Sequence, residues 1–383
     1  MPIFNQVVAG GGSTPTCYIE KTVDANGVLK SGTNIIDLSG VKDVEQHQLA
    51  FAYYNQPSVT GSVNLSSLTK VTGESAFDNA FYNCTGITGV IDLGLLTVVG
   101  GPYAFRNAFN GTGITGVNLS SLNTAGVASA FYGTFMNCSE IIGNVNVSSL
   151  KEILQTSAFA QTFKNCIKIT SVDFGSLEKV GANGCNELCS GCTSLINANF
   201  DNLKQITNSS GFGGVFIGCT SLPTFRFCSL NSIGAQSALT SCFKNCTALQ
   251  SLWFYALGTN SFGSRTNQFN GMLYGVTGCT VHFPMAIQST IGSWMDVTNG
   301  FSGTNTTVLF DIVTTLTGAD SNTYTRQEKD STSTATAWVY NDTLYYTSGV
   351  SDNANGVNEP SVSDAIYSDA ACTQSVTTIT AIA

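Results

Sequence analysis

The stretch Ala80-Phe81-Tyr82-Asn83-Cys84-Thr85-Gly86-Ile87-Thr88 contains the unit that decides the fold. Its Asn-Cys pair, or a Gly-Cys pair in the same place, recurs at Cys84, Cys138, Cys166, Cys192, Cys219 and Cys246. Gln56 and Gly111 fill the corresponding place where cysteine is absent. The steps between these eight positions are 28, 27, 27, 28, 26, 27 and 27 residues. Self-similarity at such a fixed period is typical of a solenoid.

A short strand is expected after each of these pairs. Residues 63–68, 117–122 and 172–177 carry apolar side chains at every second position, which is typical of a strand with one buried face. One strand of this length cannot bury its face alone. Stacked copies therefore predict a parallel sheet over a continuous core.

A pair of phenylalanines four residues apart comes before the Asn-Cys corner in several repeats. This spacing would place both rings on one side of a helical turn. We therefore predict a strand, a loop, a helical turn and a corner in each repeat. The residues expected to fill the interior are the six cysteines above together with Phe77, Phe81, Phe105, Phe109, Phe131, Phe135, Phe159 and Phe163.

These Ala-Phe, Asn-Cys-Thr and Leu/Ile-x-x-Val-x-Leu blocks together resemble the BspA-like leucine-rich repeat over about residues 34–283. The resemblance implies an α/β solenoid of about eight leucine-rich repeats with a parallel β-sheet face. It also implies a surface or adhesion protein, since the family looks like a set of surface proteins with different targets. The repeats here are longer than the family's shorter forms, and most lack the proline often found in the strand motif. The resemblance is thus more specific for fold than for function.

Four segments follow from this organisation. Residues 1–33, with Gly10-Gly11-Gly12, form an N-terminal docking or capping segment, a disordered terminus being the alternative. Residues 34–283 form the solenoid, and residues 284–314 form a C-terminal cap in which Trp294 and Phe301 cover the last open core. Residues 315–383 are rich in Thr, Ser, Asp and Asn and predict a small all-β module. Its strands are expected within 337–346, around an Asn-Asp turn, and at 365–369 and 376–382.

Composition excludes several classes of function. The net charge is −9 and the 15 Lys and Arg residues form no cluster, whereas nucleic-acid binding needs a positive stripe. No stretch reaches the roughly 18 apolar residues of a membrane-spanning helix. The first 12 residues lack the positive region and the long apolar run of a signal peptide. We therefore expect neither nucleic acid nor membrane insertion, and no export signal.

One cysteine cluster has the spacing of a metal site. Cys185-x3-Cys189-x2-Cys192 is similar to the cluster-binding motif of radical enzymes that use S-adenosylmethionine, where three thiolates hold an iron–sulfur cluster. The repeat register offers a second explanation, because Cys185 and Cys189 occupy the positions of Phe159 and Phe163 one repeat earlier. We favour interior positions for all three thiols, and we predict neither a metal nor a cofactor.

Catalytic constellations are not found either. The two histidines, His47 and His282, belong to opposite ends of the solenoid, which excludes a histidine-based zinc site or catalytic triad. Asp92 and Asp173 sit in equivalent strand positions three repeats apart. At the usual strand spacing they would be about 14 Å apart, farther than the carboxylate pairs of glycoside hydrolases. The sequence therefore predicts a protein that is not an enzyme.

A binding surface is expected where strand residues point away from the core. One outward ladder is Asn64, Asp92, Asn118, Asn146, Asp173, Asn199, Arg226, Trp253. A second is Ser66, Gly94, Ser120, Ser148, Gly175, Asp201, Cys228, Tyr255. The ladders end on Arg226, Trp253 and Tyr255, residue types that dominate binding hot spots. We predict these three as ligand contacts; the alternative is that the cap or the β module covers them.

Two functions remain open at this point. The first is a virion surface protein, either a fibre-like decoration or a host-binding element. Its partners would be other virion proteins through the N-terminal segment, a host-surface protein or glycan, and other copies of this chain. The second is a secreted bacterial adhesin that binds a host protein or glycan. The missing export signal favours the first.

Overall fold

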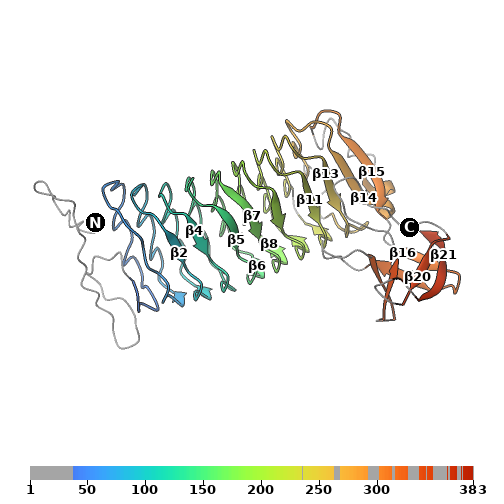
Figure 1. Ribbon diagram of the computed structural model, residues 1–383, viewed down its shortest axis with the longest axis horizontal. Helices are drawn as coiled ribbons and strands as arrows, with labels where there is room; N and C mark the ends of the chain where they lie inside the picture. Colours follow the sequence, from blue (N-terminus) through green and yellow to red (C-terminus); the bar gives the residue numbers. More distant parts are fainter. Residues whose placement is uncertain are drawn as a thin grey trace, which may run out of the picture.

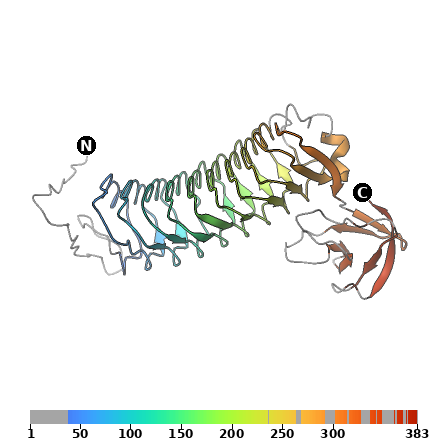
Figure 2. The same ribbon diagram turned by 45° about the horizontal axis from the view of Figure 1, so that its top comes forward.

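The computed structural model describes residues 38–234, 236–262, 268–291, 302–312, 315–326, 336–341, 343–347, 360, 363–368, 372 and 374–382. Within these ranges the chain forms a stack of similar turns followed by a small β-barrel (Figure 1). Figure 2 shows the same stack after rotation, with the barrel again beside the last turns. The predicted docking segment 1–33 and the cap residues Trp294 and Phe301 lie outside the described residues.

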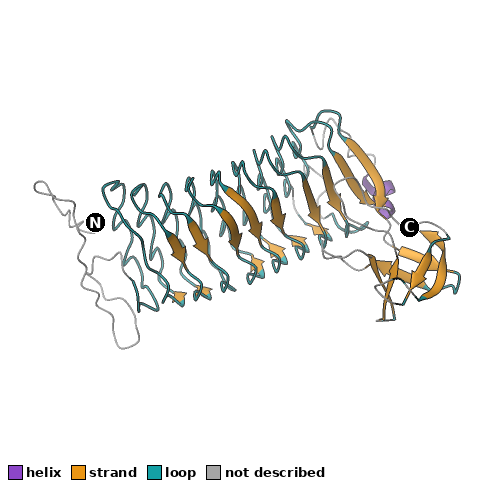
Figure 3. Cartoon of the chain, viewed as in Figure 1, coloured by secondary structure: helices purple, strands orange, loops and turns teal. Residues whose placement is uncertain are grey.

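The main strands of the solenoid are parallel and lie along one side of the stack (Figure 3). Five form one sheet in the order β2-β4-β5-β7-β9, and four form the next in the order β11-β13-β14-β15. Their bounds are β2 (Val90–Asp92), β4 (Gly116–Asn118), β5 (Gly143–Asn146), β7 (Ile169–Asp173), β9 (Asn197–Asn199), β11 (Thr224–Phe227), β13 (Ser251–Phe254), β14 (Thr280–Pro284) and β15 (Thr307–Ile312). The predicted parallel sheet is thereby confirmed. It continues into the segment expected to be a cap, because β15 pairs in parallel with β14.

A second set of strands, each two residues long, follows the main strands around the turn. These are β1 (Lys70–Val71), β3 (Val98–Val99), β6 (Glu152–Ile153), β8 (Lys179–Val180), β10 (Gln205–Ile206) and β12 (Ser232–Ile233). β1 pairs with β3, and the other four pair in the order β12-β10-β8-β6. Two narrow sheets therefore run along the solenoid beside the main ones.

The predicted helical turn is wrong. The segment that carries Phe77 and Phe81 is a chain of hydrogen-bonded turns, and the N–H groups of these two residues donate to carbonyls of the next repeat, Ala104 (2.7 Å) and Ala108 (2.8 Å). In an α-helix they would donate within their own segment. A four-residue turn unit brings both rings to the same side, so the spacing alone could not separate this structure from a helix.

Left-handed backbone conformations explain why the segment is not helical. Ser75, Asn79 and Asn83 have φ values of 52°, 53° and 60°, so every fourth residue interrupts a right-handed helix. Asparagine and glycine tolerate this conformation best. The same positions hold Asn165 (φ 61°) and Gly191 (φ 78°) at the corners of later repeats. Positive φ thus explains the exchange of asparagine and glycine before the cysteine.

The corner asparagines also bond to one another across turns. The Asn165 side-chain amide donates to Asn137 (2.9 Å), and that of Asn83 donates to Asn55 (3.0 Å). We expect Asn165→Val to lower the free energy of unfolding by about 1–3 kcal/mol, because a β-branched residue is strained at positive φ and the bond is lost. Urea unfolding measures this. Asn165→Gly is the control and should stay within about 1 kcal/mol; equal losses would contradict the role of φ.

Two repeat positions differ from those expected. Gly111 (φ 72°) occupies the corner position of Asn83, so that Thr112 is the equivalent of Cys84. Likewise Gly275 (φ 77°) is a corner, because Asn245 donates to the preceding residue, Tyr274 (2.7 Å), and Val276 follows in the cysteine position. The solenoid therefore continues with almost unchanged period where the Asn-Cys pair disappears from the sequence.

The interior is one continuous core. Every phenylalanine and cysteine named above for the interior is fully buried. The phenylalanines form two stacked columns, with centroids of neighbouring rings 4.8 to 5.7 Å apart. Where Cys185 and Cys189 replace phenylalanine, the strands supply Phe174 and Phe200, stacked at 5.0 Å. The large side chains move from the turns to the strands, which keeps the core filled.

The C-terminal module is a closed antiparallel barrel with a core of its own. Its strands are β16 (Thr315–Gly318), β17 (Thr323–Arg326), β18 (Thr336–Tyr340), β19 (Thr343–Thr347), β20 (Ala365–Tyr367) and β21 (Ser375–Ile382). The all-β module expected from the sequence is confirmed. Trp338 is buried at its centre and donates to Thr347 (2.9 Å).

Helix is scarce in the described part of the chain. A 3₁₀ turn, η1 (Met285–Ile287), and the four-residue α1 (Gln288–Ile291) follow β14. Among the described residues, no helix has the length and apolar character needed to cross a membrane.

Candidate functional sites

The first outward ladder follows the register that the sequence predicts. Asp92 is paired with Asn118, and Asp173 with Asn199, in adjacent strands. In six repeats the side-chain oxygen of the ladder residue accepts a hydrogen bond from the backbone N–H two residues later. These pairs are Asn64 with Ser66, Asp92 with Gly94, Asn118 with Ser120, Asn146 with Ser148, Asp173 with Gly175 and Asn199 with Asp201. Each is an Asx turn that ends a strand.

The aspartates of this ladder have a second structural contact. Asp92 Oδ1 also accepts a hydrogen bond from the Asn118 side-chain amide (2.9 Å). A Cβ on Gly94 would lie 2.5 Å from that amide nitrogen, which explains glycine where the other repeats have serine. Asp173, Gly175 and Asn199 repeat this arrangement. The ladder was interpreted as free polar surface, yet the recurring Asn-x-Ser and Asp-x-Gly spacing is itself an Asx-turn signal.

Trp253, one of the three predicted ligand contacts, is buried. Only 3% of its surface is exposed. His282 from β14 stacks on its ring with centroids 3.4 Å apart, and Arg226 is its in-register neighbour on β11. The expected exposure of Trp253 is therefore wrong, because the solenoid continues past the point where the sequence repeat fades.

The barrel covers part of the same area. The Arg326 guanidinium lies over the Tyr255 ring at 5.2 Å and over the Trp338 ring at 5.7 Å. Tyr255 is half-buried and lies 5.9 Å from Trp253. The alternative in which the β module covers the predicted contacts thus holds for Tyr255. The structure brings Arg226, Trp253 and Tyr255 together, but as the joint between solenoid and barrel.

The cysteine column consists of buried thiols that donate to main-chain carbonyls of the preceding turn. Cys84 Sγ lies 2.8 Å from the Tyr53 oxygen, and Cys138 Sγ lies 3.0 Å from that of Phe109. Cys166, Cys192, Cys219 and Cys246 repeat the contact at 2.9 to 3.2 Å. A thiol thus combines a small apolar volume with a weak donor.

Burial raises the pKa of these thiols. The pKa of Cys138 rises to about 11 and that of Cys246 to about 12, in both cases mainly because the thiolate would lose its hydration. The pKa of Cys185 is likewise raised by burial. The thiols are neutral at physiological pH, which is the unreactive form.

The Cys185-Cys189-Cys192 cluster lies in this interior, with all three residues fully buried. Among the residues that the structure describes, no group of three or more His, Cys, Asp or Glu side chains is arranged to hold a metal ion. His47 is exposed at the N-terminal end of the solenoid, whereas His282 is buried near its C-terminal end. Asp92 and Asp173 are separated by the strands β4 and β5.

Comparison with protein-family models gives no match, and comparison with curated proteins gives none either. Among solved structures, the chain overlaps a leucine-rich cell surface protein of Faecalibacterium prausnitzii A2-165 at 12% identity and a TM-score of 0.25. The overlap covers 76% of this chain and 93% of that one. A similarity of this size carries no conclusion about function. On its own coordinates, the chain is a leucine-rich-repeat-like β-solenoid that ends in a small antiparallel β-barrel.

Proposed function

We propose that this chain is a non-enzymatic surface protein of a virus particle, in which the solenoid is a rigid spacer that carries the barrel at one end. One hydrophobic cluster extends from Leu38 to Phe310, so the stack forms a single body. The outward Asn and Asp side chains are engaged in Asx turns, which supports a structural rather than a catalytic role. Its partners are other particle proteins and a host-surface protein or glycan.

The observation that carries the choice of a virus particle is the column of free thiols. Successive turns are about 5 Å apart, since neighbouring rings are separated by 4.8 to 5.7 Å. Cysteines in adjacent turns, such as Cys166 and Cys192, therefore have a spacing that a disulfide can bridge. They are free and donate to carbonyls instead. This chemistry suits a protein that folds in a reducing cytoplasm, as particle proteins do before release, better than one exported through an oxidising compartment.

Mass spectrometry of gradient-purified particles tests the proposal. We expect peptides of this chain to co-purify with the known structural proteins of the particle, at a constant ratio across the gradient. The alternative is a secreted bacterial adhesin. Recovery of the chain only from the bacterial cell surface or the culture medium would support that alternative and overturn the particle assignment.

A further inference from the structure

One of the narrow sheets is interrupted in the middle of the solenoid. Thr124 bridges to Val98 on one side, and β6 pairs with β8 on the other. β6 is the edge of its four-stranded sheet. The main sheet continues past this point through the pairing of Asn118 with Asn146. The interruption is therefore local, between residues 123–126 and β6.

The interruption leaves backbone groups without the bonds that other turns make. In the next turn, the Glu178 N–H donates to Lys151 and the Gly181 N–H donates to Ile153, each at 2.7 Å. The equivalent donors one turn earlier are the N–H groups of Lys151 and Leu154. Across the part of the chain that the structure describes, no backbone hydrogen bond joins residues 151–154 to residues 123–126.

Small residues accompany this opening. Ala125 occupies the position that holds Val99 and Ile153 in the neighbouring turns, and Gly126 stands where the next turn has Leu154. A groove of about 340 Å³ lies here. Its size is within the range of small-molecule sites, roughly 300–1,000 Å³.

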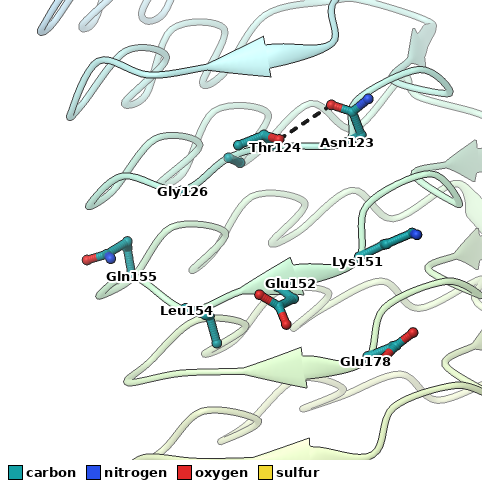
Figure 4. Close-up of a pocket in the computed structure, with 9 residues that line it drawn as sticks. Asn123, Thr124, Gly126, Lys151, Glu152, Leu154, Gln155 and Glu178 are labelled. Carbon is teal, nitrogen blue, oxygen red and sulfur yellow. Dashed lines mark hydrogen bonds between the residues drawn. The ribbon is translucent and has the colours of Figure 1, made fainter.

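The groove is lined by hydrogen-bonding groups of both kinds, from three successive turns (Figure 4). Asn123 and Gln155 offer amides, and Glu152 and Glu178 offer carboxylates. Both carboxylates are paired with lysines outside the lining, Glu152 with Lys179 (3.0 Å) and Glu178 with Lys204 (3.5 Å). The carboxylates therefore keep acceptor capacity, while much of their charge is balanced.

Lys151 and Leu154 complete the lining. Lys151 is exposed, and no ion pair involving it is found among the described residues. Leu154 is 43% exposed and provides an apolar patch beside the polar groups. The groove thus combines donors, acceptors and one apolar contact without a dominant charge.

We propose that this groove binds a neutral sugar residue of a surface glycan. Neighbouring hydroxyls of a sugar donate and accept at once, which matches a lining of carboxylates, amides and open backbone N–H groups. The C–H face of the ring suits Leu154 and the small residues beside it. A phosphate or nucleic acid would meet two carboxylates, and an apolar ligand would leave the polar groups without hydrogen bonds. The inference builds on the proposed surface role, for which it names a ligand class and a site.

Saturation-transfer NMR on the full chain tests this site, with the methyl glycosides of glucose, galactose, mannose and N-acetylglucosamine as probes. Gly126→Leu fills the groove: a Cβ there meets only Thr124, at 3.8 Å, and the backbone is not in the left-handed region. Gly100→Leu is the matched control, in the same repeat position one turn earlier with no atom within 4 Å of its Cβ. Glu152→Gln removes an anionic acceptor and preserves the shape.

We expect at least one of the four glycosides to bind, Gly126→Leu to weaken it more than tenfold and Glu152→Gln to weaken it about fivefold. Gly100→Leu should bind like the wild type. Absence of binding by all four glycosides, or equal binding by Gly126→Leu and Gly100→Leu, would overturn the site. Either result leaves the particle assignment to its own experiment, because the chain can be a particle component without this site.

Discussion

Raising the pH from 8 to about 10.5 is expected to unfold this protein cooperatively, with a loss of stability on the order of 10 kcal/mol. Nine of the described cysteines have a raised pKa in the folded state, with burial the largest cause for eight of them; for Cys189 a hydrogen bond with Cys192 ranks first. Each shift of one unit corresponds to about 1.4 kcal/mol. Many small shifts on one column therefore add to a large effect.

The sign follows from the direction of the shifts. A folded thiol with a raised pKa stays protonated, while the same thiol in the unfolded chain ionises above its ordinary value near 8.5. The unfolded chain then binds fewer protons, so that stability falls as the pH rises. The stabilisation is fully present below the ordinary pKa and is lost on the way to the folded values, about 11 for Cys138 and about 12 for Cys246 and Cys279.

Urea unfolding at a series of pH values measures this loss. Lysines and tyrosines also titrate in the window, so the control is a variant with Cys138→Ala and Cys246→Ala, whose stability should fall less steeply with pH between 9 and 11. A stability that is flat from pH 8 to 10.5 would contradict the buried column. A slope unchanged by the two substitutions would contradict its assignment to cysteine.

Phe135→Ala is expected to cost about 3–5 kcal/mol, the usual range for a buried phenylalanine. Phe135 is fully buried and stacks between Phe109 (5.7 Å) and Phe163 (5.6 Å). Removing its ring leaves a cavity and ends two ring contacts. Since each turn of a solenoid contacts only its neighbours, the loss should be concentrated in the turns that carry these flanking rings.

Urea unfolding gives the size of this effect, and hydrogen exchange gives its location. Ile142→Ala is the control, because Ile142 is 61% exposed in the neighbouring part of the same turn. It should change stability by no more than about 0.5 kcal/mol. Similar losses for both variants, or faster exchange spread evenly over the whole chain, would argue against a column of stacked rings.

The repeat, the parallel sheet and the buried column follow from the sequence because a fixed period requires equivalent residues to meet. The conformation of the turn segment does not follow, since Phe77 and Phe81 would share one side in a helix as well. The exchange of Asn83 with Gly111 and Gly191 was the available sign of positive φ. It was taken for a side-chain effect.

The ligand contacts were harder to predict. The last turns keep the period but lose the Asn-Cys pair, as Val276 shows, so the repeat was judged to end too early. Trp253 was therefore expected on the surface, although β14 and β15 extend the sheet beyond it. The groove beside β6 depends on hydrogen bonds between turns, and a single sequence does not contain that information.

The central claim is that equivalent residues of successive repeats lie side by side, and disulfide trapping tests it most directly. Asn144 pairs with Ser171, and Ser171 pairs with Asn197, on the outward side of the main sheet. Adjacent turns are about 4.8 Å apart, within reach of a disulfide, whereas two turns span about 10 Å. We expect the pairs Asn144→Cys with Ser171→Cys and Ser171→Cys with Asn197→Cys to cross-link within the chain on mild oxidation, and Asn144→Cys with Asn197→Cys to stay reduced. Cross-linking of the last pair as fast as the first two, or of none of them, would contradict the stacked solenoid.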